Sequence, residues 1–237
     1  MAIAVQEATI LAIECAGSAL SIAIVRHDRV HTLHEGSTAQ HGQCLLPLIQ
    51  QACQAQHLAL KNIDLIAVGI GPGSFTGVRT AITAAQGLAL ALGKSVVGVD
   101  SLQALAWQAQ ACGVTGVVVS LLDARMGEIY GAVYRCTAPT YSPQLLMTPS
   151  VQKPQAAQQW LNHNPIVCIG NVLVQDDDFL KDVQQIQAVP SAAAIGALGR
   201  LALIAGETVL PENLHPMYVR NHVAMTISER AALGHTI

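Results

Sequence analysis

The first third of the chain alternates short apolar runs with polar turns. Three of these runs predict strands at Ile10 to Ile13, Ala19 to Val25 and Val30 to Glu35, because each is rich in aliphatic residues and stops at a turn. A helix is expected from about Gln43 to His57, where the apolar positions keep a helical spacing. Pro47 falls in the first turn of this helix, where proline is tolerated.

The next stretch alternates buried strands with helices. IDLIAVGIG (residues 63–71) predicts a buried strand, and the glycine-rich turn after it leads into a long helix from Val78 to Leu92. SVVGVD (95–100) predicts another strand and SLQALAWQAQAC (101–112) another helix, with Ser101 as its expected N-cap.

The scheme then starts again in the second half of the chain. The predicted elements are, in chain order, the strands GVVVSLLDA (116–124), EIYGAVYRC (128–136) and PQLLMTP (143–149), the helix KPQAAQQWLNHN (153–164), the strand IVCIGNV (166–172) and the helix PSAAAIGALGRLALIAG (190–206). Both halves therefore read strand-strand-strand-helix-strand-helix, and an acidic residue, Glu14 or Asp123, ends the first strand of each half.

This repetition predicts an α/β fold of two duplicated lobes, each with a mixed sheet flanked by helices. We expect residues 1–100 to form the N-terminal lobe and residues 101–237 the smaller C-terminal lobe, with the boundary near the 101–112 helix. The proline-bounded tail LPENLHPMYVRNHVAM (210–225) is expected to pack back on a lobe.

Composition narrows the function classes. The 237-residue chain is 51% hydrophobic and only 11% charged, below the roughly 25% charged residues of an ordinary domain, which suggests that part of the surface is an interface. The net charge is −3 and the basic residues are scattered, so the chain alone should bind nucleic acid poorly.

The cysteines and the apolar stretches indicate a cytoplasmic protein. None of the 6 cysteines has CxxC spacing, so we expect reduced, mostly buried thiols. The N-terminus lacks a basic region, so it is not expected to be a signal peptide. The apolar run from Ala81 to Leu92 is shorter than the roughly 20 residues that a membrane span needs.

The glycine-rich turn GPGSFTG (71–77) fits no phosphate-binding motif. The lysine of a P-loop and the third glycine of a dinucleotide fingerprint are both absent. Anion binding at the helix N-terminus, with Arg79 nearby, stays an alternative. A tight turn with Ser74 or Thr76 as helix cap is the simpler expectation.

The helix after this turn carries one charge, Arg79. A helix that is apolar all round must be buried, either sandwiched within the chain or covered in an oligomer. Its small residues, Ala81, Ala84, Ala85, Gly87 and Ala91, would let another helix approach closely. We therefore favour an oligomer interface over a sandwiched helix.

Metal and protease sites are not favoured. His27, His31 and His34 lie in or beside a predicted hairpin, where side chains four residues apart along a strand are roughly 13 Å apart, so we expect a solvated surface. Ser18, Ser74 and Cys15 are available as nucleophiles, but no motif frames any of them.

Glu14 and Asp123 could face one cleft, as paired carboxylates do in duplicated phosphotransferases. The loops after them, CAGSALS and ARMGEIY, lack the hydroxyl-rich and glycine-rich character of phosphate hairpins. Asp123 beside Arg125 is more simply a local ion pair or turn.

Four segments together resemble the TsaB (YeaZ) family of the bacterial tRNA threonylcarbamoyladenosine machinery. They are ILAIECAGSALSIAIV, AVGIGPGSFTGVRTAITAAQGLALALGKSVVGVDSLQALA, DARMGEIYGAVY and PMYVRN, in order over nearly the whole chain. The resemblance implies an actin-like (ASKHA) fold and a non-catalytic scaffold subunit that dimerises with the catalytic TsaD protein through helices of the N-terminal lobe. A small-molecule phosphotransferase of the same fold stays the alternative.

The resemblance also implies the partners and the contact surface. TsaD and a TsaE-like ATPase are the expected partners. ATP or ADP and metal are expected on TsaD, with no cofactor bound by this chain alone. The chain is expected to contact tRNA only through the complex and to form a homodimer when the partner is absent. The expected interface residues are Leu45, Leu48, Ile49, Thr76, Arg79, Thr80, Ile82, Thr83, Ala84, Gln86, Gly87 and Leu90. One departure is IECA (13–16), where the family usually has an IDTS-like strand end, so the hydroxyls that could touch a phosphate are missing.

Overall fold

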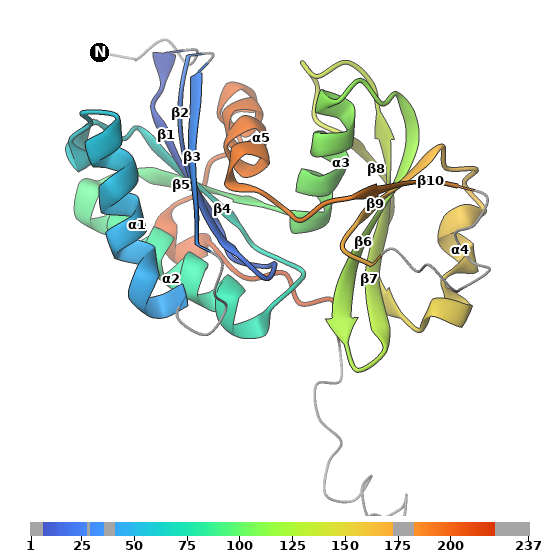
Figure 1. Ribbon diagram of the computed structural model, residues 1–237. Helices are drawn as coiled ribbons and strands as arrows, with labels where there is room; N and C mark the ends of the chain where they lie inside the picture. The colour runs from blue at the N-terminus through green and yellow to red at the C-terminus, as the bar shows by residue number, and fades with distance from the viewer. Residues whose placement is uncertain (1–6, 28, 36–40, 173–182, 221–237) are drawn as a thin grey trace, which may run out of the picture.

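The computed structural model describes residues 7–27, 29–35, 41–172 and 183–220 as two five-stranded sheets with helices around them (Figure 1). The first sheet has the order β3-β2-β1-β4-β5 and the second β10-β9-β6-β7-β8. The strands of the first sheet are β1 (Ile10–Glu14), β2 (Leu20–Arg26), β3 (Arg29–Glu35), β4 (Leu65–Gly69) and β5 (Ser95–Val99). Those of the second are β6 (Gly116–Arg125), β7 (Glu128–Cys136), β8 (Gln144–Gln152), β9 (Val167–Gly170) and β10 (Gln184–Gln187).

The two sheets have the same topology. In the first, β1 pairs antiparallel with β2 and parallel with β4. In the second, β6 pairs antiparallel with β7 and parallel with β9. The predicted duplication into two mixed-sheet lobes is therefore confirmed.

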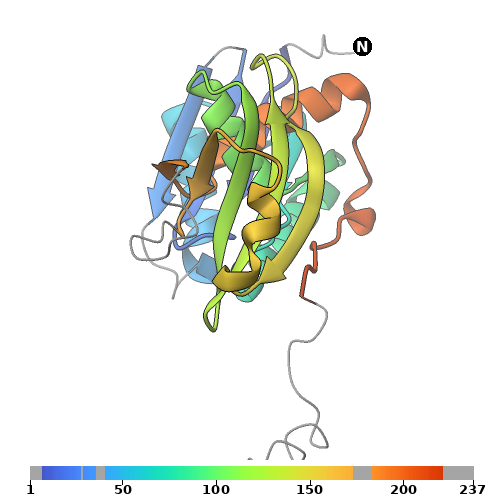
Figure 2. The ribbon, with the colours of Figure 1, turned by 90° about the vertical axis from the view of Figure 1, so that its right-hand side faces the viewer.

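The helices form layers on both faces of each sheet, as Figures 1 and 2 show. α1 (His41–Ala55) and α2 (Phe75–Leu92) cover the outer face of the first sheet. α5 (Ala192–Ala205) and α3 (Ser101–Ala111) lie between the two sheets, and the short α4 (Gln158–Leu161) covers the outer face of the second sheet, where Trp160 is fully buried. Each face of each sheet thus has its own apolar core.

The last helix packs on the first sheet, although it follows the strands of the second. α5 shares a core with β1, β2 and β4, and Gly196 and Gly199 face Ala12, Val25 and Ala67 so closely that any side chain there would collide. The glycines thus let the helix backbone approach small residues of the sheet, while α3 packs on the second sheet. The expected boundary near residues 101–112 therefore separates the strands of the two sheets along the chain. It does not assign every later element to the second lobe, because α5 packs on the first sheet.

Two predicted details are wrong, and one strand was missed. Asp100, not Ser101, is the N-cap of α3, because its carboxylate accepts from the Leu102 N–H at 2.8 Å. The expected helix 153–164 is reduced to the 3-10 turn η4 (Pro154–Ala156) and the four-residue α4. The polar edge strand β10 was not predicted, because QQIQ has one apolar residue and depends on pairing with β9.

The segment after α5 returns along the first lobe, as expected for the tail. Val209 forms an isolated antiparallel bridge with Val96 of β5. The 3-10 turn η5 (Pro211–Asn213) packs near α2, and the Met217 N–H donates to the Ile70 carbonyl. Residues 221–225 of the predicted tail lie outside the described residues. Within the described part of the chain, no helix combines the length and apolarity that crossing a membrane requires.

Candidate functional site

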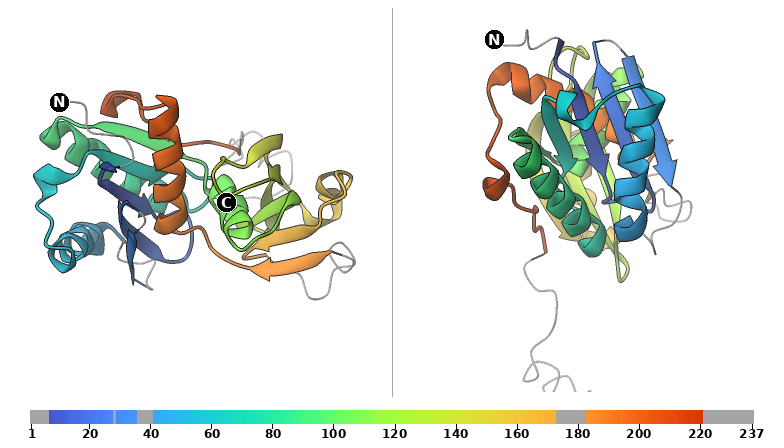
Figure 3. Two further views of the ribbon diagram at one scale, coloured as in Figure 1. Left: turned by 90° about the horizontal axis from the view of Figure 1, so that it is seen from above. Right: turned by 90° about the vertical axis from the view of Figure 1, so that its left-hand side faces the viewer.

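A groove runs between α1 and α2 on the outer surface of the first lobe. The inner faces of both helices are buried in the core above the sheet, and the two helices lie side by side with no other described element over them (Figure 3, right). The hollow has a volume of about 760 Å³. It is lined by Gly42, Leu45, Leu46, Phe75, Thr76, Arg79, Thr80, Thr83, Ala84, Gly87 and Leu88.

The lining is apolar and open to solvent. Leu46 and Phe75 leave 56% and 54% of their surface exposed, and threonine methyls, alanine and glycine supply most of the rest. Exposed apolar side chains gathered in one concave patch are typical of a protein contact surface. α2 is therefore not sandwiched within the described chain, because one face is core and the other is groove.

The structure places the predicted interface residues in three groups. Seven of them line the groove, namely Leu45, Thr76, Arg79, Thr80, Thr83, Ala84 and Gly87. Leu48, Ile49 and Ile82 are buried in the core, so they support the floor of the groove and offer no surface. Gln86 donates to the carbonyls of Pro211 and Leu214, and Leu90 is exposed outside the lining.

Sequence reasoning missed four lining residues, Gly42, Leu46, Phe75 and Leu88. Phe75 lay before the predicted helix start at Val78, but α2 begins one turn earlier, at Phe75. Helical spacing from an earlier start, through Arg79 and Thr83 to Gly87, would have placed Phe75 on the same face.

Arg79 is held at one end of the groove. Its guanidinium lies 3.8 Å from the centre of the Phe75 ring, and its Nε and Nη2 donate to the Tyr218 hydroxyl at 3.1 and 2.7 Å. The charge therefore sits between two aromatic rings, one on α2 and one on the returning tail.

The glycine-rich turn packs against the end of β1. The Ser74 N–H donates to the Ala16 carbonyl at 2.8 Å, and the Ser74 hydroxyl caps α2 by accepting from the Gly77 N–H at 3.3 Å. Side-chain atoms at Gly73 or Gly77 would collide with the backbone of Ala16 or Cys15. Ser74 as helix cap is confirmed, and the glycines serve a close backbone approach.

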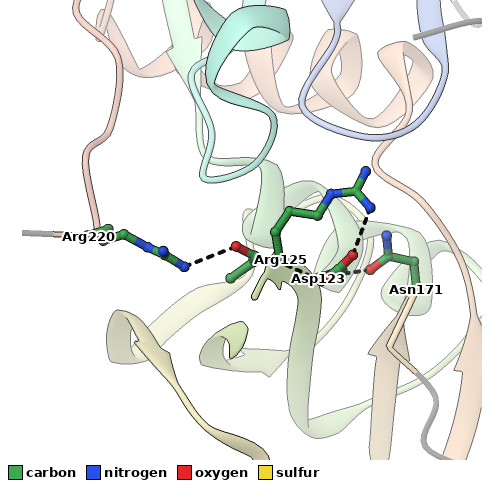
Figure 4. A network of polar contacts seen from close by, with 5 residues as sticks. Asp123, Arg125, Asn171 and Arg220 are labelled. Carbon is green, nitrogen blue, oxygen red and sulfur yellow. Dashed lines mark hydrogen bonds and ion pairs between the residues drawn. The ribbon is translucent and has the colours of Figure 1, made fainter. Parts of the chain in front are cut away.

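A second hollow, of about 550 Å³, lies between the lobes. The turns after β1 and before α2 form one wall, the β6–β7 turn and Asn171 form the other, and residues 216–220 of the tail close a side. Figure 4 shows the polar groups of the second wall.

The charged side chains of this cleft pair with each other. Arg125 lies 3.3 Å from Asp123, whose carboxylate also accepts from the Arg125 N–H, so the predicted local ion pair is confirmed. Arg220 pairs with Glu128 at 2.6 Å and donates to the Ala124 carbonyl at 3.0 Å. The Asn171 amide oxygen accepts from the Asp123 N–H at 2.9 Å.

Glu14, the counterpart of Asp123, is turned inward. It is fully buried, does not line the cleft, and accepts from the Ala16 N–H and the Ser101 hydroxyl. Burial raises the pKa of Glu14 from 4.5 to about 7, against the lowering by these hydrogen bonds. The two acids therefore do not face one site.

Asp100 is a half-buried acid at the joint between the lobes. Burial raises its pKa from 3.8 to about 6, although it accepts hydrogen bonds from Tyr134 and the Leu102 N–H. The Tyr134 hydroxyl belongs to β7, so this bond ties the start of α3 to the second sheet.

The other candidate chemistries gain no support from the geometry. Among the described residues, no three His, Cys, Asp or Glu side chains gather as metal ligands. Cys15 is buried and its thiol pKa is raised by burial, and Ser74 serves as a helix cap. Neither side chain forms a hydrogen bond to a histidine in the described part of the chain.

Comparison with known proteins identifies the family. The Escherichia coli (strain K12) "tRNA threonylcarbamoyladenosine biosynthesis protein TsaB" is 32% identical over 223 residues, covering 91% of this chain and 96% of that protein. The chain belongs to the TsaB family. The Haemophilus influenzae TsaB is 28% identical, covering 92% of this chain and 96% of its own.

Solved structures agree with this assignment to the TsaB (YeaZ) family. "YeaZ from Pseudomonas aeruginosa" superposes with a TM-score of 0.77 at 29% identity, covering 89% of this chain and 100% of that one. A structure described as an uncharacterized protein with similarity to peptidase YEAZ from Pseudomonas aeruginosa gives a TM-score of 0.81 at 31% identity, covering 90% and 100%.

The sequence model of a related family also matches. "TsaD: tRNA N6-adenosine threonylcarbamoyltransferase" matches residues 30–168. That range runs from β3 in the first sheet into β9 in the second.

Proposed function

We propose that this chain takes part in the biosynthesis of threonylcarbamoyladenosine in tRNA as a non-catalytic docking subunit. It binds a TsaD-type threonylcarbamoyltransferase through the groove between α1 and α2. The observation that carries the proposal is the apolar groove itself, which is open to solvent on the outer face of a lobe whose inner face is already packed.

The names of the relatives support the pathway, and the TsaD match supports the partner. A partner with the same architecture carries two helices at the equivalent place. Two such helix pairs can pack ridges into grooves, and the small residues Ala84 and Gly87 in this groove permit a close approach.

The polar cleft supports a non-catalytic role. Its arginines are paired with Asp123 and Glu128, and Glu14 is turned into the core. We therefore propose that ATP or ADP and metal belong to the TsaD-type partner, that a TsaE-like ATPase completes the assembly, and that tRNA is reached through the complex. No specific observation favours the phosphotransferase alternative.

In the absence of the partner, we propose that the same face pairs with a second copy of the chain. A two-fold contact places one patch against itself, which would cover the exposed Leu46 and Phe75 side chains.

An Ala84→Glu variant tests the docking surface. Ala84 is half-buried in the groove lining, and an unpaired carboxylate in an apolar interface costs several kcal/mol, so we expect affinity for the co-expressed TsaD-type subunit to fall at least about 100-fold. Isothermal titration calorimetry measures it. Ala111→Glu is the matched control, because Ala111 is exposed at the end of α3 and does not line the groove.

The two variants should separate cleanly. Ala111→Glu should bind as the unmodified chain does, and circular dichroism should show both variants folded. Wild-type affinity in folded Ala84→Glu would place the docking surface elsewhere.

A further inference from the structure

Arg79 is the one charged residue among those that line the groove. Helices α1 and α2 contain no Asp, Glu or Lys between residues 41–55 and 75–92. A lone cation in an apolar contact surface must find a counter-charge, because leaving a charge unpaired in a buried interface is costly.

The guanidinium is fixed and still has donors to offer. Of the five N–H donors of an arginine, those of Nε and Nη2 meet the Tyr218 hydroxyl. No Asp or Glu within the described residues forms an ion pair with Arg79. The guanidinium carbon lies 3.8 Å from the centre of the Phe75 ring and 5.7 Å from the centre of the Tyr218 ring, and these contacts restrict the position of the guanidinium.

We infer that the partner presents a carboxylate to Arg79, on an apolar helix that lies along the groove at its Phe75 end. This inference rests on the proposed function and adds the chemistry that selects the partner. Arginine pairs with carboxylates through two parallel hydrogen bonds, and a head held between rings loses little freedom when it forms them.

The groove of a second copy has no carboxylate among its described lining residues to offer to Arg79. In a two-fold contact, the groove meets a groove, and neither the lining nor the two helices carry an acid. Arg79 therefore raises the affinity for a partner with a carboxylate relative to the affinity for a second copy of the chain. A single charge can in this way make an interface specific.

The test compares Arg79→Met in two binding reactions. Methionine keeps an apolar stem beside Phe75 and removes the charge. We expect affinity for the co-expressed TsaD-type subunit, measured by calorimetry, to fall roughly 10- to 100-fold. Self-association, measured by analytical ultracentrifugation, should be unchanged or tighter.

Two further variants define the mechanism. Arg79→Lys keeps the charge without the planar fork, so it should recover part of the lost affinity and give binding that weakens as salt is raised. Tyr218→Phe removes the hydroxyl that holds the guanidinium and should weaken partner binding only a few-fold, to a smaller extent than Arg79→Met.

The outcomes separate the two proposals. Wild-type partner affinity in Arg79→Met, or an equal loss in both reactions, overturns the role of Arg79. If Ala84→Glu still abolishes binding in that case, the groove remains the docking surface. If Ala84→Glu also binds normally, the proposed function itself fails.

Discussion

The two hollows of this molecule, the groove over α1 and α2 and the cleft between the lobes, use their polar groups in different ways. In the cleft, each arginine has an acidic partner from the same chain, Asp123 for Arg125 and Glu128 for Arg220. In the groove, the partners of Arg79 among the described residues are the Tyr218 hydroxyl and the rings of Phe75 and Tyr218. The arginines of the cleft are thus neutralised by acids of the same chain, whereas the charge of Arg79 in the groove is free to pair with a group on another molecule.

The difference shows where binding capacity lies in this duplicated fold. Ligands of α/β sheets usually bind near the carboxyl ends of the strands, which here means the ends of β1 and β6. At that place the Ser74 turn packs on Ala16 and Glu14 faces inward. The chain's own residues thus fill part of the place at the ends of β1 and β6 where a ligand would bind. The apolar surface that stays open to solvent lies on the outer helices α1 and α2.

The largest effect is expected from Gly77→Ala, which disturbs the packing at the end of β1. A methyl group at Gly77 would collide with the Cys15 carbonyl, so we expect a loss of about 3 kcal/mol in the free energy of unfolding, as for other overpacked sites. Urea denaturation measures this. Gly87→Ala is the control, because nothing lies within 4 Å of a methyl group there, and it should gain up to about 1 kcal/mol.

Equal stability of the two glycine variants would show that the turn does not depend on close approach to β1. The cleft would then have the room that close packing at Gly77 otherwise takes up.

Glu14→Gln should change how stability depends on pH. Between about pH 4.5 and 7 the unfolded chain releases the Glu14 proton while the folded chain keeps it, so the free energy of unfolding falls as pH rises through this window. The variant should lose this part of the slope, about 2–3 kcal/mol between pH 5 and 8. Asp100, with its pKa raised to about 6, keeps a slope of the same sign.

Denaturation curves at several pH values, recorded with and without Mg²⁺, measure this effect. An unchanged slope in Glu14→Gln would contradict the raised pKa. A strong rise in stability with Mg²⁺ in the unmodified chain alone would make Glu14 a metal ligand and revive the phosphotransferase alternative.

The smallest effect is expected from Arg125→Ala in the cleft. The side chains of Arg125 and Asp123 are 80% and 40% exposed, and exposed ion pairs contribute about 0–1 kcal/mol. Stability and affinity for the TsaD-type subunit should both stay close to those of the unmodified chain. A tenfold loss of partner affinity would assign the cleft a role in docking.

The sequence predicted the elements that depend on local pattern. The strands of the first sheet, the Ser74 cap and the Asp123–Arg125 pair all follow from residues close together in the chain. The N-cap of α3 was assigned one residue too late, since Asp100 and Ser101 are both good caps and only the buried contact of Ser101 with Glu14 decides between them.

The remaining features depend on contacts between distant segments. Nothing local in α5 shows that it packs on the first sheet, since its apolar pattern fits either lobe. Arg79 was predicted as an interface residue, but its position is set by Tyr218, which lies 139 residues away in the chain. Leu48, Ile49 and Ile82 share the apolar character of groove residues and differ only in facing the sheet.

Hydrogen exchange reports on both hollows in one experiment, with the chain measured alone and with saturating TsaD-type subunit. If the groove is the docking surface, amide exchange should slow in residues 41–55 and 75–92, which form the groove, and stay unchanged in the β6–β7 turn around residues 123–128. Protection of that turn, with no change in α1 and α2, would contradict docking at the groove.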